Sequence, residues 1–396
     1  MWQKVKNVYH LLVAILANIY YGFPSRRLVI IGVTGTDGKT TTTSLVYHIL
    51  KEAGYKVSII STVSAIIHGK AYDTGFHVTN PSSFPLQKFL SEAVKKGDTH
   101  LVLEVTSHGL DQNRVWGIPF AIGVLTNITH EHLDYHKTYS EYLQAKMKLL
   151  NSAKVAVINR DDNSFHKVKY FLKKNKRVIT YGQKNADFSL DSIKMPANIN
   201  TLYNKYNGTA AGIVAREFGI NKKIIEKALK TFIFPKGRTE MVYEKDFNVM
   251  IDFAHTPNAF KQLLSSLSEK TKGRLIHVFG SAGARDVSKR PLMGKIASDY
   301  DDILIITSED PRKENPKKII ADIEKGVRSE KKAQTYTIID RKSAIERAIF
   351  LAQKGDFVII TGKAHENSMN YGKGEEPWDE FKVVEKALQE KTKSNN

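Results

Sequence analysis

The chain has 396 residues, of which 41% are hydrophobic and 26% charged, so it can form about two or three domains with buried cores. It contains no cysteine, which excludes disulfides, cysteine nucleophiles and cysteine-ligated zinc and fits the reducing cytoplasm. The net charge of +19 comes largely from lysines spread along the chain, and no nucleic-acid-binding motif accompanies them. We therefore expect a basic solvated surface and no nucleic-acid partner.

Residues 1–27 form an unusual N-terminal segment. An apolar run extends from Asn7 to Tyr21, and Lys4 and Lys6 precede it. The run is too short and too interrupted to span a bilayer, and it lacks the small-residue cleavage site of a signal peptide. Two interpretations stay open: an interfacial helix in peripheral contact with a membrane, and a helix that packs on the protein itself.

Strand-like and helix-like runs alternate from residue 28 to residue 234. A helix is predicted over Lys39–Ala53, with Gly54 as its C-cap, and a helical region over Tyr203–Thr231. Strands are predicted at Leu28–Val33, Lys56–Thr62, His100–Val105, Ala121–Ile128, Val155–Asn159 and Arg177–Tyr181. This alternation predicts an α/β fold with a mostly parallel, buried sheet.

The segment Phe234-Pro-Lys-Gly237 is typical of a domain boundary. A hairpin is predicted over Val242–Phe253, and the α/β alternation then resumes. Its strands are predicted at Arg274–Phe279, Ile303–Thr307, Tyr336–Ile339 and Phe357–Thr361. The sequence therefore predicts an N-terminal segment at 1–27 and two α/β domains at 28–234 and 235–396.

A glycine-rich turn, Gly32-Val-Thr-Gly35-Thr-Asp-Gly38-Lys39-Thr40-Thr41, follows the first strand and opens a helix. A strand, a turn and a helix in this order present backbone N–H groups and a helix N-terminus to phosphate. Lys39 would reach the terminal phosphates, and the Thr40 hydroxyl would bind Mg²⁺. Val33 breaks the strict G-x4-G-K-[ST] spacing, but the shorter G-T-x-G-K-T form is present. The sequence thus predicts a nucleotide site.

Metal ligands are expected near this turn. Glu104 ends a predicted strand, and in a parallel sheet this places it beside the phosphate loop. Carboxylate and hydroxyl oxygens suit Mg²⁺, so Glu104 and Thr40 are candidates. The histidines His108, His130, His132 and His136 cluster in the same part of the chain. By residue type alone each of them is more often structural, and their spacings do not favour zinc.

Ten motifs in order resemble the Mur ligases, in particular the MurE type, from about residue 28 onward. They are Gly35-Thr-Asp-Gly-Lys-Thr40; Leu103-Glu104-Val-Thr-Ser-His108 with Gln112 and Arg114; Thr126-Asn127 with Glu131-His132-Leu-Asp-Tyr-His136; Tyr142-Leu-Gln-Ala-Lys146; Asn204 and Asn207; Gly237-Arg238-Thr-Glu240; Asp252-Phe-Ala-His255-Thr-Pro257; Phe279-Gly280 with Arg285-Asp286 and Lys289-Arg290-Pro291; Glu309-Asp310-Pro-Arg312; and Gly362-Lys-Ala-His-Glu366. The resemblance implies a P-loop-type central ATPase domain and a C-terminal Rossmann-like ligase domain.

The resemblance also implies a reaction in cell-wall peptidoglycan synthesis, with the associated roles in cell shape and cell division. ATP phosphorylates a carboxylate of a muramoyl-peptide precursor, and the amine of a free amino acid attacks the acyl phosphate. By resemblance, ATP is held by Gly35, Thr36, Asp37, Gly38, Lys39, Thr40, Thr41, Asn207, Arg238 and His255. The catalytic residues would be Lys39, Glu104, His132 and Lys146, and Mg²⁺ would be bound by Thr40, Glu104, His132 and a carbamylated Lys146. On sequence alone, Lys146 would be a surface lysine of a helix.

The two organic substrates are assigned to separate residue sets by the same resemblance. The acceptor peptide would contact Thr79, Asn80, Thr106, Gln112 and Arg114, with Asn80 in place of the family's threonine. The incoming amino acid would contact Arg285, Glu309, Asp310, Arg312, Gly362 and Glu366. A retained Arg312 suits a second carboxylate and favours meso-diaminopimelate. Asp310, which replaces the asparagine of the family's D-N-P-R signature, could attract an ammonium, so L-lysine stays open.

Several departures from the family affect these expectations. MurE-type enzymes carry an N-terminal uridine-nucleotide-binding domain, and we expect this chain to lack it because only residues 1–27 stand in its place. A lipid-linked substrate would suit that apolar segment. Glu131 and Ala364 replace a family aspartate and glycine, and residues 281–284 replace a glycine- and aspartate-containing loop.

Three other classes of protein stay in view. A Mur-like amidating subunit would use ammonia, but such proteins usually carry a cysteine zinc ribbon. A non-catalytic nucleotide-binding module is disfavoured by the joint presence of Lys39, Glu104, His132, Lys146 and Glu366. A nucleic-acid binder rests on net charge alone. Folate- or glutamate-polymerising ligases share the ATP core but not the Asp-Pro-Arg and Gly-Lys-Ala-His-Glu segments.

Overall fold

A computed structural model describes residues 2–72, 80–328, 330 and 333–394 of the chain. These residues form two compact units. The first unit comprises the described residues up to Thr129 and those from His136 to Pro235, and the second comprises 130–135 and the described residues from Lys236 onward. The short segment 130–135 thus groups with the second unit, although the chain on both sides of it belongs to the first.

The first unit is built on a nine-stranded sheet in the order β4-β3-β2-β5-β1-β6-β7-β8-β9. All neighbouring strands are parallel except at one edge, where β2 pairs antiparallel with β3 and β3 pairs antiparallel with β4. The strands are β1 Val29–Thr34, β2 Val57–Ile60, β3 Ala65–Ile67, β4 Lys70–Tyr72, β5 His100–Glu104, β6 Phe120–Leu125, β7 Val155–Asn159, β8 Arg177–Gly182 and β9 Phe188–Ser189. The order places β1 between β5 and β6, so the segments that follow these three strands meet at one edge of the sheet.

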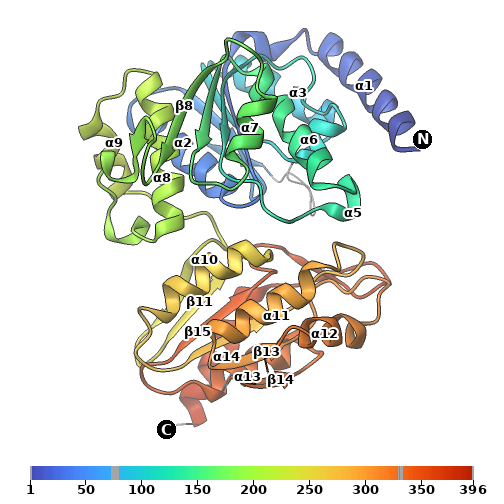
Figure 1. The fold of residues 1–396 in the computed structure, drawn as a ribbon, viewed down its shortest axis with the longest axis vertical. Helices are drawn as coiled ribbons and strands as arrows, with labels where there is room; N and C mark the ends of the chain where they lie inside the picture. Colours follow the sequence, from blue (N-terminus) through green and yellow to red (C-terminus); the bar gives the residue numbers. More distant parts are fainter. Residues whose placement is uncertain (1, 73–79, 329, 331–332, 395–396) are drawn as a thin grey trace. The chain divides into compact units, whose positions relative to one another are not determined.

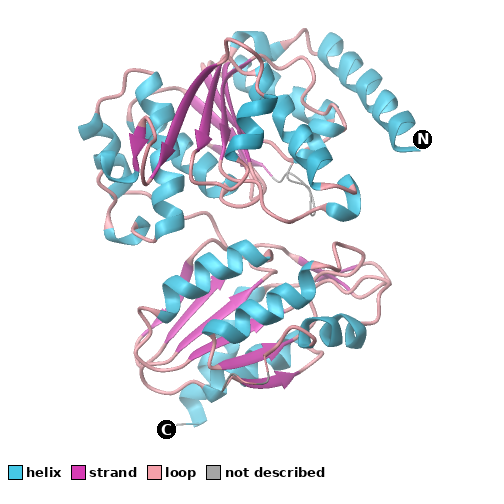
Figure 2. Ribbon diagram, in the orientation of Figure 1, coloured by secondary structure: helices cyan, strands magenta, loops and turns pink. Residues whose placement is uncertain are grey.

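Helices cover both faces of this sheet, as Figure 2 shows. The helices of the first unit are α1 Trp2–Tyr20, α2 Lys39–Glu52, α3 Ser83–Lys95, α4 Ser107–Asp111, α6 Tyr139–Ser152, α7 Phe165–Phe171, α8 Leu202–Glu217 and α9 Lys222–Lys230, with 3-10 turns at Pro24–Arg27, Leu190–Ser192 and Ala197–Ile199. The short helix α5, Leu133–His136, begins in the segment 130–135 that groups with the second unit. One core joins α2, α8 and α9 to the sheet. The opposite cores join α3, α6 and α7 to it. Successive side chains of a strand point into opposite cores, as Ile30 and Ile31 do. Because both faces of the sheet are covered, the strands are apolar throughout.

The second unit has a six-stranded sheet in the order β10-β11-β15-β12-β13-β14 and a separate β16–β17 hairpin. The strands are β10 Glu240–Glu244, β11 Asn248–Asp252, β12 Leu275–Phe279, β13 Ile303–Ile306, β14 Gln334–Thr337, β15 Phe357–Thr361, β16 Ser368–Asn370 and β17 Glu375–Pro377. Strand β10 pairs antiparallel with β11, and the other pairings in the six-stranded sheet are parallel.

Helices again pack on two sides of the second sheet (Figure 1). They are α10 Pro257–Ser268, α11 Lys289–Tyr300, α12 Pro316–Glu324, α13 Arg341–Leu351 and α14 Glu380–Ser394. Helices α13 and α14 share a core with the strands, and α10, α11 and α12 pack against one another in sequence. The predicted α/β class with mostly parallel sheets is confirmed, and the predicted hairpin after residue 242 corresponds to β10 and β11.

Candidate active site

The phosphate loop connects β1 to α2 and occupies residues 35–38. Gly38 has φ of +78° and is the N-cap of α2, a conformation that glycine adopts without strain. A Cβ on Gly35 would overlap the Thr126 side chain, and a Cβ on Gly38 would overlap Asn207. The first turn of α2 directs backbone N–H groups outward at Lys39 and Thr40, because these positions have no intrahelical acceptors. Both glycines are therefore required by close packing as well as by the turn.

Residues that follow β6 fix the shape of this loop. The Thr126 hydroxyl donates to the Asp37 carbonyl at 2.6 Å. The Asn127 side chain accepts from the Asp37 amide at 2.9 Å, and its carbonyl accepts from the Thr36 amide at 2.9 Å. The Thr126-Asn127 pair therefore orders the loop backbone that would surround phosphate.

Thr40 and Glu104 lie side by side, as their positions after β1 and β5 predict. The Thr40 hydroxyl donates to Glu104 Oε1 at 3.1 Å. Glu104 is 1% exposed and also accepts from the amide and the hydroxyl of Thr62, each at 2.9 Å. The carboxylate is thus held at the loop by three donors. A hydroxyl and a carboxylate at this separation are oxygen ligands of the kind that Mg²⁺ takes.

Lys146 is buried, so its interpretation as a surface lysine is wrong. It lies on α6, is 1% exposed, and its Nζ donates to the Gly35 carbonyl at 2.5 Å. Burial, and then the charge of Lys39, hold the pKa of Lys146 well below its ordinary value. The side chain thus contacts the loop at Gly35, and its buried environment favours the neutral form of the amine.

Two further nucleotide candidates contact the loop. The Lys39 ammonium donates to the Thr36 carbonyl at 2.7 Å, so it lies over the loop that would hold phosphate. Asn207, on α8, accepts from the Thr42 hydroxyl at 3.1 Å. Asn207 therefore lies at the start of α2, the helix whose first two residues are Lys39 and Thr40.

The candidate acceptor residues form one hydrogen-bonded network after β5. Asn80 is 1% exposed and donates to the Glu104 carbonyl at 2.6 Å, while its Oδ1 accepts from the Thr106 amide and hydroxyl at 2.7 and 2.8 Å. Arg114 donates to the Asn80 carbonyl at 2.7 Å and to Gln112 at 2.9 Å. Because both ends of its side-chain amide are hydrogen-bonded inside the protein, Asn80 positions Thr106 and the end of β5. Thr79, which the sequence also indicated, lies outside the described residues.

The four clustered histidines separate between the two units. His108 and His136 have ring centroids 5.5 Å apart in the first unit, and burial lowers the pKa of His136 to about 4. His130 contacts Ser288 in the second unit, with which His132 is also grouped. Over the described part of the chain, no group of three His, Asp or Glu side chains could hold a metal. The expected joint ligand role of Thr40, Glu104, Lys146 and His132 stays a prediction.

In the second unit, the two remaining nucleotide candidates gather around Phe253, just after β11. The Arg238 guanidinium lies 4.4 Å from the centre of the Phe253 ring. The rings of His255 and His365 each lie 4.8 Å from the same ring. Burial lowers the pKa of His365 to about 3, so the imidazole is neutral. Arg238 and His255 are thus brought together with the Gly362–Glu366 motif.

The amino-acid candidates lie at the carboxyl ends of β12, β13 and β15. Lys363 is fully buried and donates to both Asp310 oxygens at 3.0 Å and to Glu366 at 2.6 Å. Asp310 also accepts from the Asn370 amide at 2.9 Å. The carboxylate of Asp310 is therefore satisfied within the protein, which argues against its role as a lysine ammonium receptor.

Arg285 lies within electrostatic range of Arg312. Burial, and then the charge of Arg312, lower the pKa of Arg285, while the carboxylates of Asp134, Glu131 and Glu366 oppose this effect. Arg312 donates to the Gly283 carbonyl at 3.2 Å and has φ of +53°. Two arginines in one region of the second unit suit an anionic ligand.

Glu309 is a second buried acid of this region. Its Oε2 lies against Gly362 and receives no hydrogen bond from the described residues. Burial raises the pKa of Glu309 to about 7. The unsatisfied oxygen is suited to a donor that a ligand would bring.

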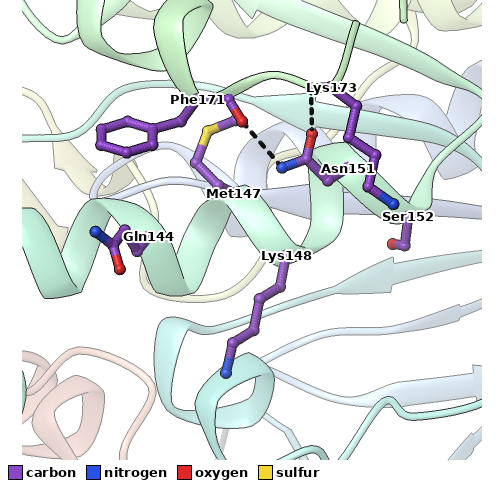
Figure 3. Close-up of a pocket in the computed structure, with 7 residues that line it drawn as sticks. All are labelled: Gln144, Met147, Lys148, Asn151, Ser152, Phe171 and Lys173. Atoms are coloured by element: carbon purple, nitrogen blue, oxygen red, sulfur yellow. Dashed lines mark hydrogen bonds between the residues drawn. The ribbon is translucent and has the colours of Figure 1, made fainter.

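A surface hollow between α6 and α7 lies apart from these residues (Figure 3). The residues that line it are Gln144, Met147, Lys148, Asn151, Ser152, Phe171 and Lys173. The Asn151 side chain donates to the Phe171 carbonyl and accepts from the Lys173 amide. The hollow contains none of the candidate site residues.

Sequence reasoning missed the residues that support the site. Thr62 holds Glu104, Lys363 binds Asp310, and Arg341 donates to the carbonyls of Ser308 and Thr361. Lys363 could have been singled out because it lies inside the Gly362–Glu366 motif. No local sequence signal marks Thr62 or Arg341, because their role depends on strands that are distant in the sequence.

Comparison with known proteins finds similarity over both units. A family described as the Mur ligase middle domain matches residues 33–224, and one described as the Mur ligase, glutamate ligase domain matches residues 237–364. A relative from Clostridium acetobutylicum, named UDP-N-acetylmuramoyl-L-alanyl-D-glutamate--2,6-diaminopimelate ligase 1, is 38% identical over 400 residues. The match covers 95% of this chain and 81% of the relative.

Two solved structures extend the comparison. The structure of a UDP-N-acetylmuramoyl-L-alanyl-D-glutamate--2,6-diaminopimelate ligase matches with a TM-score of 0.59 at 30% identity and covers 92% of this chain and 79% of that one. A MurF ligase from Thermotoga maritima, solved in complex with ADP, matches with a TM-score of 0.70 at 17% identity and covers 96% and 85%. The latter likeness is one of fold.

Proposed function

The chain belongs to the Mur ligase family, and we propose that it is an ATP-dependent ligase that adds meso-diaminopimelate to the D-glutamate of a muramoyl-L-alanyl-D-glutamate peptide. The observation that carries this proposal is the contact between Thr40 and Glu104 at the end of β1. It combines a phosphate-binding turn with an acidic group at the one edge of the sheet where nucleotides bind in open α/β folds.

The residues around the turn fit a magnesium nucleotide. Thr40 and Glu104 would supply a hydroxyl and a carboxylate oxygen to Mg²⁺, and phosphates and water would complete its shell. Bound Mg²⁺ neutralises charge on the transferred phosphoryl group. Lys39, whose Nζ lies on the Thr36 carbonyl, would exchange this contact for the terminal phosphates. His132 is proposed as a further ligand on family resemblance.

Lys146 supports the proposal because its environment favours a neutral amine. An amine must be neutral to add CO₂ and form a carbamate, and burial beside Lys39 lowers the pKa of Lys146 as this requires. We expect Lys146→Met to fold but to lose turnover by about 100-fold or more, the usual effect of deleting one charge-stabilising group. Retention of turnover in that variant would remove Lys146 from the machinery.

The acceptor would bind beside Glu104, where Thr106, Gln112 and Arg114 are linked through Asn80. This network extends from the Glu104 carbonyl to α4, so it connects the acceptor region to the proposed metal site. Arginine and side-chain amides suit the carboxylates and amides of a peptide. The acceptor carboxylate would attack the γ-phosphoryl group of ATP, and ADP would leave.

The amine donor would bind in the second unit, and two observations favour diaminopimelate over lysine. Arg285 lies within electrostatic range of Arg312, and two arginines suit a donor with two carboxylates. Asp310 is already paired with buried Lys363, so it does not require a lysine ammonium. Glu309 retains an unsatisfied oxygen that can accept from the amine of either amino acid. The donor amine would attack the acyl carbon, phosphate would leave, and an amide would form.

A product assay tests this function. The protein is incubated with ATP, Mg²⁺ and UDP-muramoyl-L-Ala-D-Glu and with diaminopimelate, lysine or ammonium in turn, and phosphate release and product mass are measured. We expect a tripeptide product with diaminopimelate. Product formed only with ammonium would identify an amidating subunit, and the absence of product with all three would favour a non-catalytic nucleotide-binding module.

We propose the cytoplasm as the location of the reaction, because ATP and the named substrates of the relatives fit that compartment. No helix among the described residues is long and apolar enough to cross a bilayer. We also propose that residues 1–27 make a peripheral contact with the membrane.

A further inference from the structure

Helix α1 has two faces with different surroundings. One face packs on the first unit, where Ala14, Ala17 and Asn18 are fully buried against α3 and the segment after α4. Asn18 donates to the Trp116 carbonyl at 3.1 Å, and Asn7 donates to Asp111 at 2.9 Å. These contacts confirm that the helix packs on the protein, and they fix which of its sides faces outward.

The outward face is apolar along the helix. Its seven large side chains are each more than half exposed and follow helical spacing; they are Val5, Val8, Tyr9, Leu12, Leu16, Ile19 and Tyr20. Phe84 of α3, itself 39% exposed, continues this surface, since its ring lies 6.1 Å from that of Tyr20. Figure 1 shows α1 at the periphery of the first unit. An apolar surface of eight exposed side chains on a folded unit indicates a binding surface for a partner or a membrane.

The charged side chains of the segment that carries this surface are all basic. The first 36 residues contain no Asp or Glu, whereas Lys4, Lys6, Arg26 and Arg27 all lie within them. Lys6 is exposed near the start of α1, and Arg26 and Arg27 are exposed just after its end. The apolar face is therefore flanked at both ends by cations, and no carboxylate of this segment offsets them.

We propose that this face, the α1 surface, docks on an anionic lipid bilayer, with α1 lying in the plane of the interface. Leucine, valine and isoleucine side chains would enter the acyl boundary, tyrosines would lie at the headgroup level, and the basic residues would contact lipid phosphates. A second copy of the chain fits less well, since two α1 surfaces face to face would bring cations of the same sign together.

The docked helix would hold the acceptor region near the membrane. Asn7 contacts Asp111 and accepts from Asn113 at 3.4 Å, and these residues flank Gln112 on the segment that also carries Arg114. The inference concerns where the protein works and does not depend on which amide it forms, so it can fail while the proposed reaction holds.

The test is flotation of the full chain with vesicles of phosphatidylcholine alone or with 30% phosphatidylglycerol. We expect binding to the anionic vesicles that weakens as salt is raised. Leu12→Glu with Leu16→Glu should reduce the partition coefficient more than about tenfold, since two leucines would no longer be buried. Tyr170→Glu, at an 83% exposed position of α7, is the matched control and should bind like the unaltered chain.

Two measurements keep the outcome decisive. Circular dichroism and ligase activity on the water-soluble acceptor should be unchanged in the Leu12/Leu16 variant, and a Leu12→Ser/Leu16→Ser variant covers the case in which glutamate disturbs the fold. Equal binding to both vesicle types, equal binding of the variant and the control, or a concentration-dependent dimer that the variant abolishes without vesicle binding would each overturn the proposal.

Discussion

The buried ion pair between Arg341 and Glu380 is expected to hold the amino-acid site together. Both side chains are fully buried, and Arg341 donates to the Glu380 carboxylate at 2.9 and 2.5 Å. The same guanidinium donates to the Ser308 carbonyl at 3.3 Å and to the Thr361 carbonyl at 2.7 Å. Ser308 lies two residues after β13 and Thr361 is the last residue of β15, directly before Glu309 and Gly362. One side chain therefore joins the segments that leave both strands at the candidate site.

Arg341→Met should therefore be costly. It would leave the Glu380 carboxylate buried without its cation, which usually costs about 3–5 kcal/mol. Two carbonyls would also lose a donor. Arg341→Met combined with Glu380→Leu removes both charges, and we expect a coupling free energy of at least about 2 kcal/mol in the double-mutant cycle. Urea unfolding can be followed by the fluorescence of Trp378, whose indole donates to Glu380 at 2.9 Å.

The functional result should be selective. In Arg341→Met the KM for the amine donor should rise about tenfold or more, while ATP affinity at the loop of the first unit stays unchanged. Arg347→Met is the matched control, because Arg347 is exposed on the same helix and lies over the Tyr336 ring. The reasoning is refuted if both variants unfold at the same urea concentration, or if ATP and donor binding weaken together.

Three further changes test single contacts. Gly35→Ala should reduce nucleotide affinity by about tenfold or more in a titration with ADP, because its methyl group would overlap Thr126. Asp310→Asn should weaken diaminopimelate and lysine use alike in donor kinetics, since Asp310 serves Lys363; selective loss of lysine would contradict this. Glu309 binds its proton more tightly in the folded protein, so the wild-type free energy of unfolding should fall as pH rises through about 7. Glu309→Gln should remove about 3 kcal/mol of that fall between pH 5 and pH 9 in urea unfolding, and identical pH profiles would contradict it.

The parallel strands were predictable because each carries a continuous β-branched, apolar run. The predicted strands at Val155–Asn159 and Phe357–Thr361 match β7 and β15 residue for residue. The short pairs β3–β4 and β16–β17 were missed, since strands of three residues are too short to show a period. Glu104 was placed correctly because a parallel sheet puts strand ends at one edge.

Other site features depend on contacts that no local pattern encodes. Lys146 looks like a surface lysine in its helix, and only the packing of α6 beneath Gly35 buries it. Asp310 looks available for a substrate until Lys363, which is 53 residues away in sequence, is seen to occupy it. His132 follows β6 in sequence yet groups with the second unit.

Isotope transfer gives the most direct test of carboxyl activation at the Thr40–Glu104 site. An acceptor peptide labelled with ¹⁸O in its glutamate carboxylate is turned over with ATP and diaminopimelate, and the released phosphate is analysed by mass spectrometry. We predict one ¹⁸O atom in the phosphate for each amide formed, because the carboxylate oxygen leaves with the phosphoryl group. Amide formation with unlabelled phosphate, or with label in AMP, would contradict the proposed reaction.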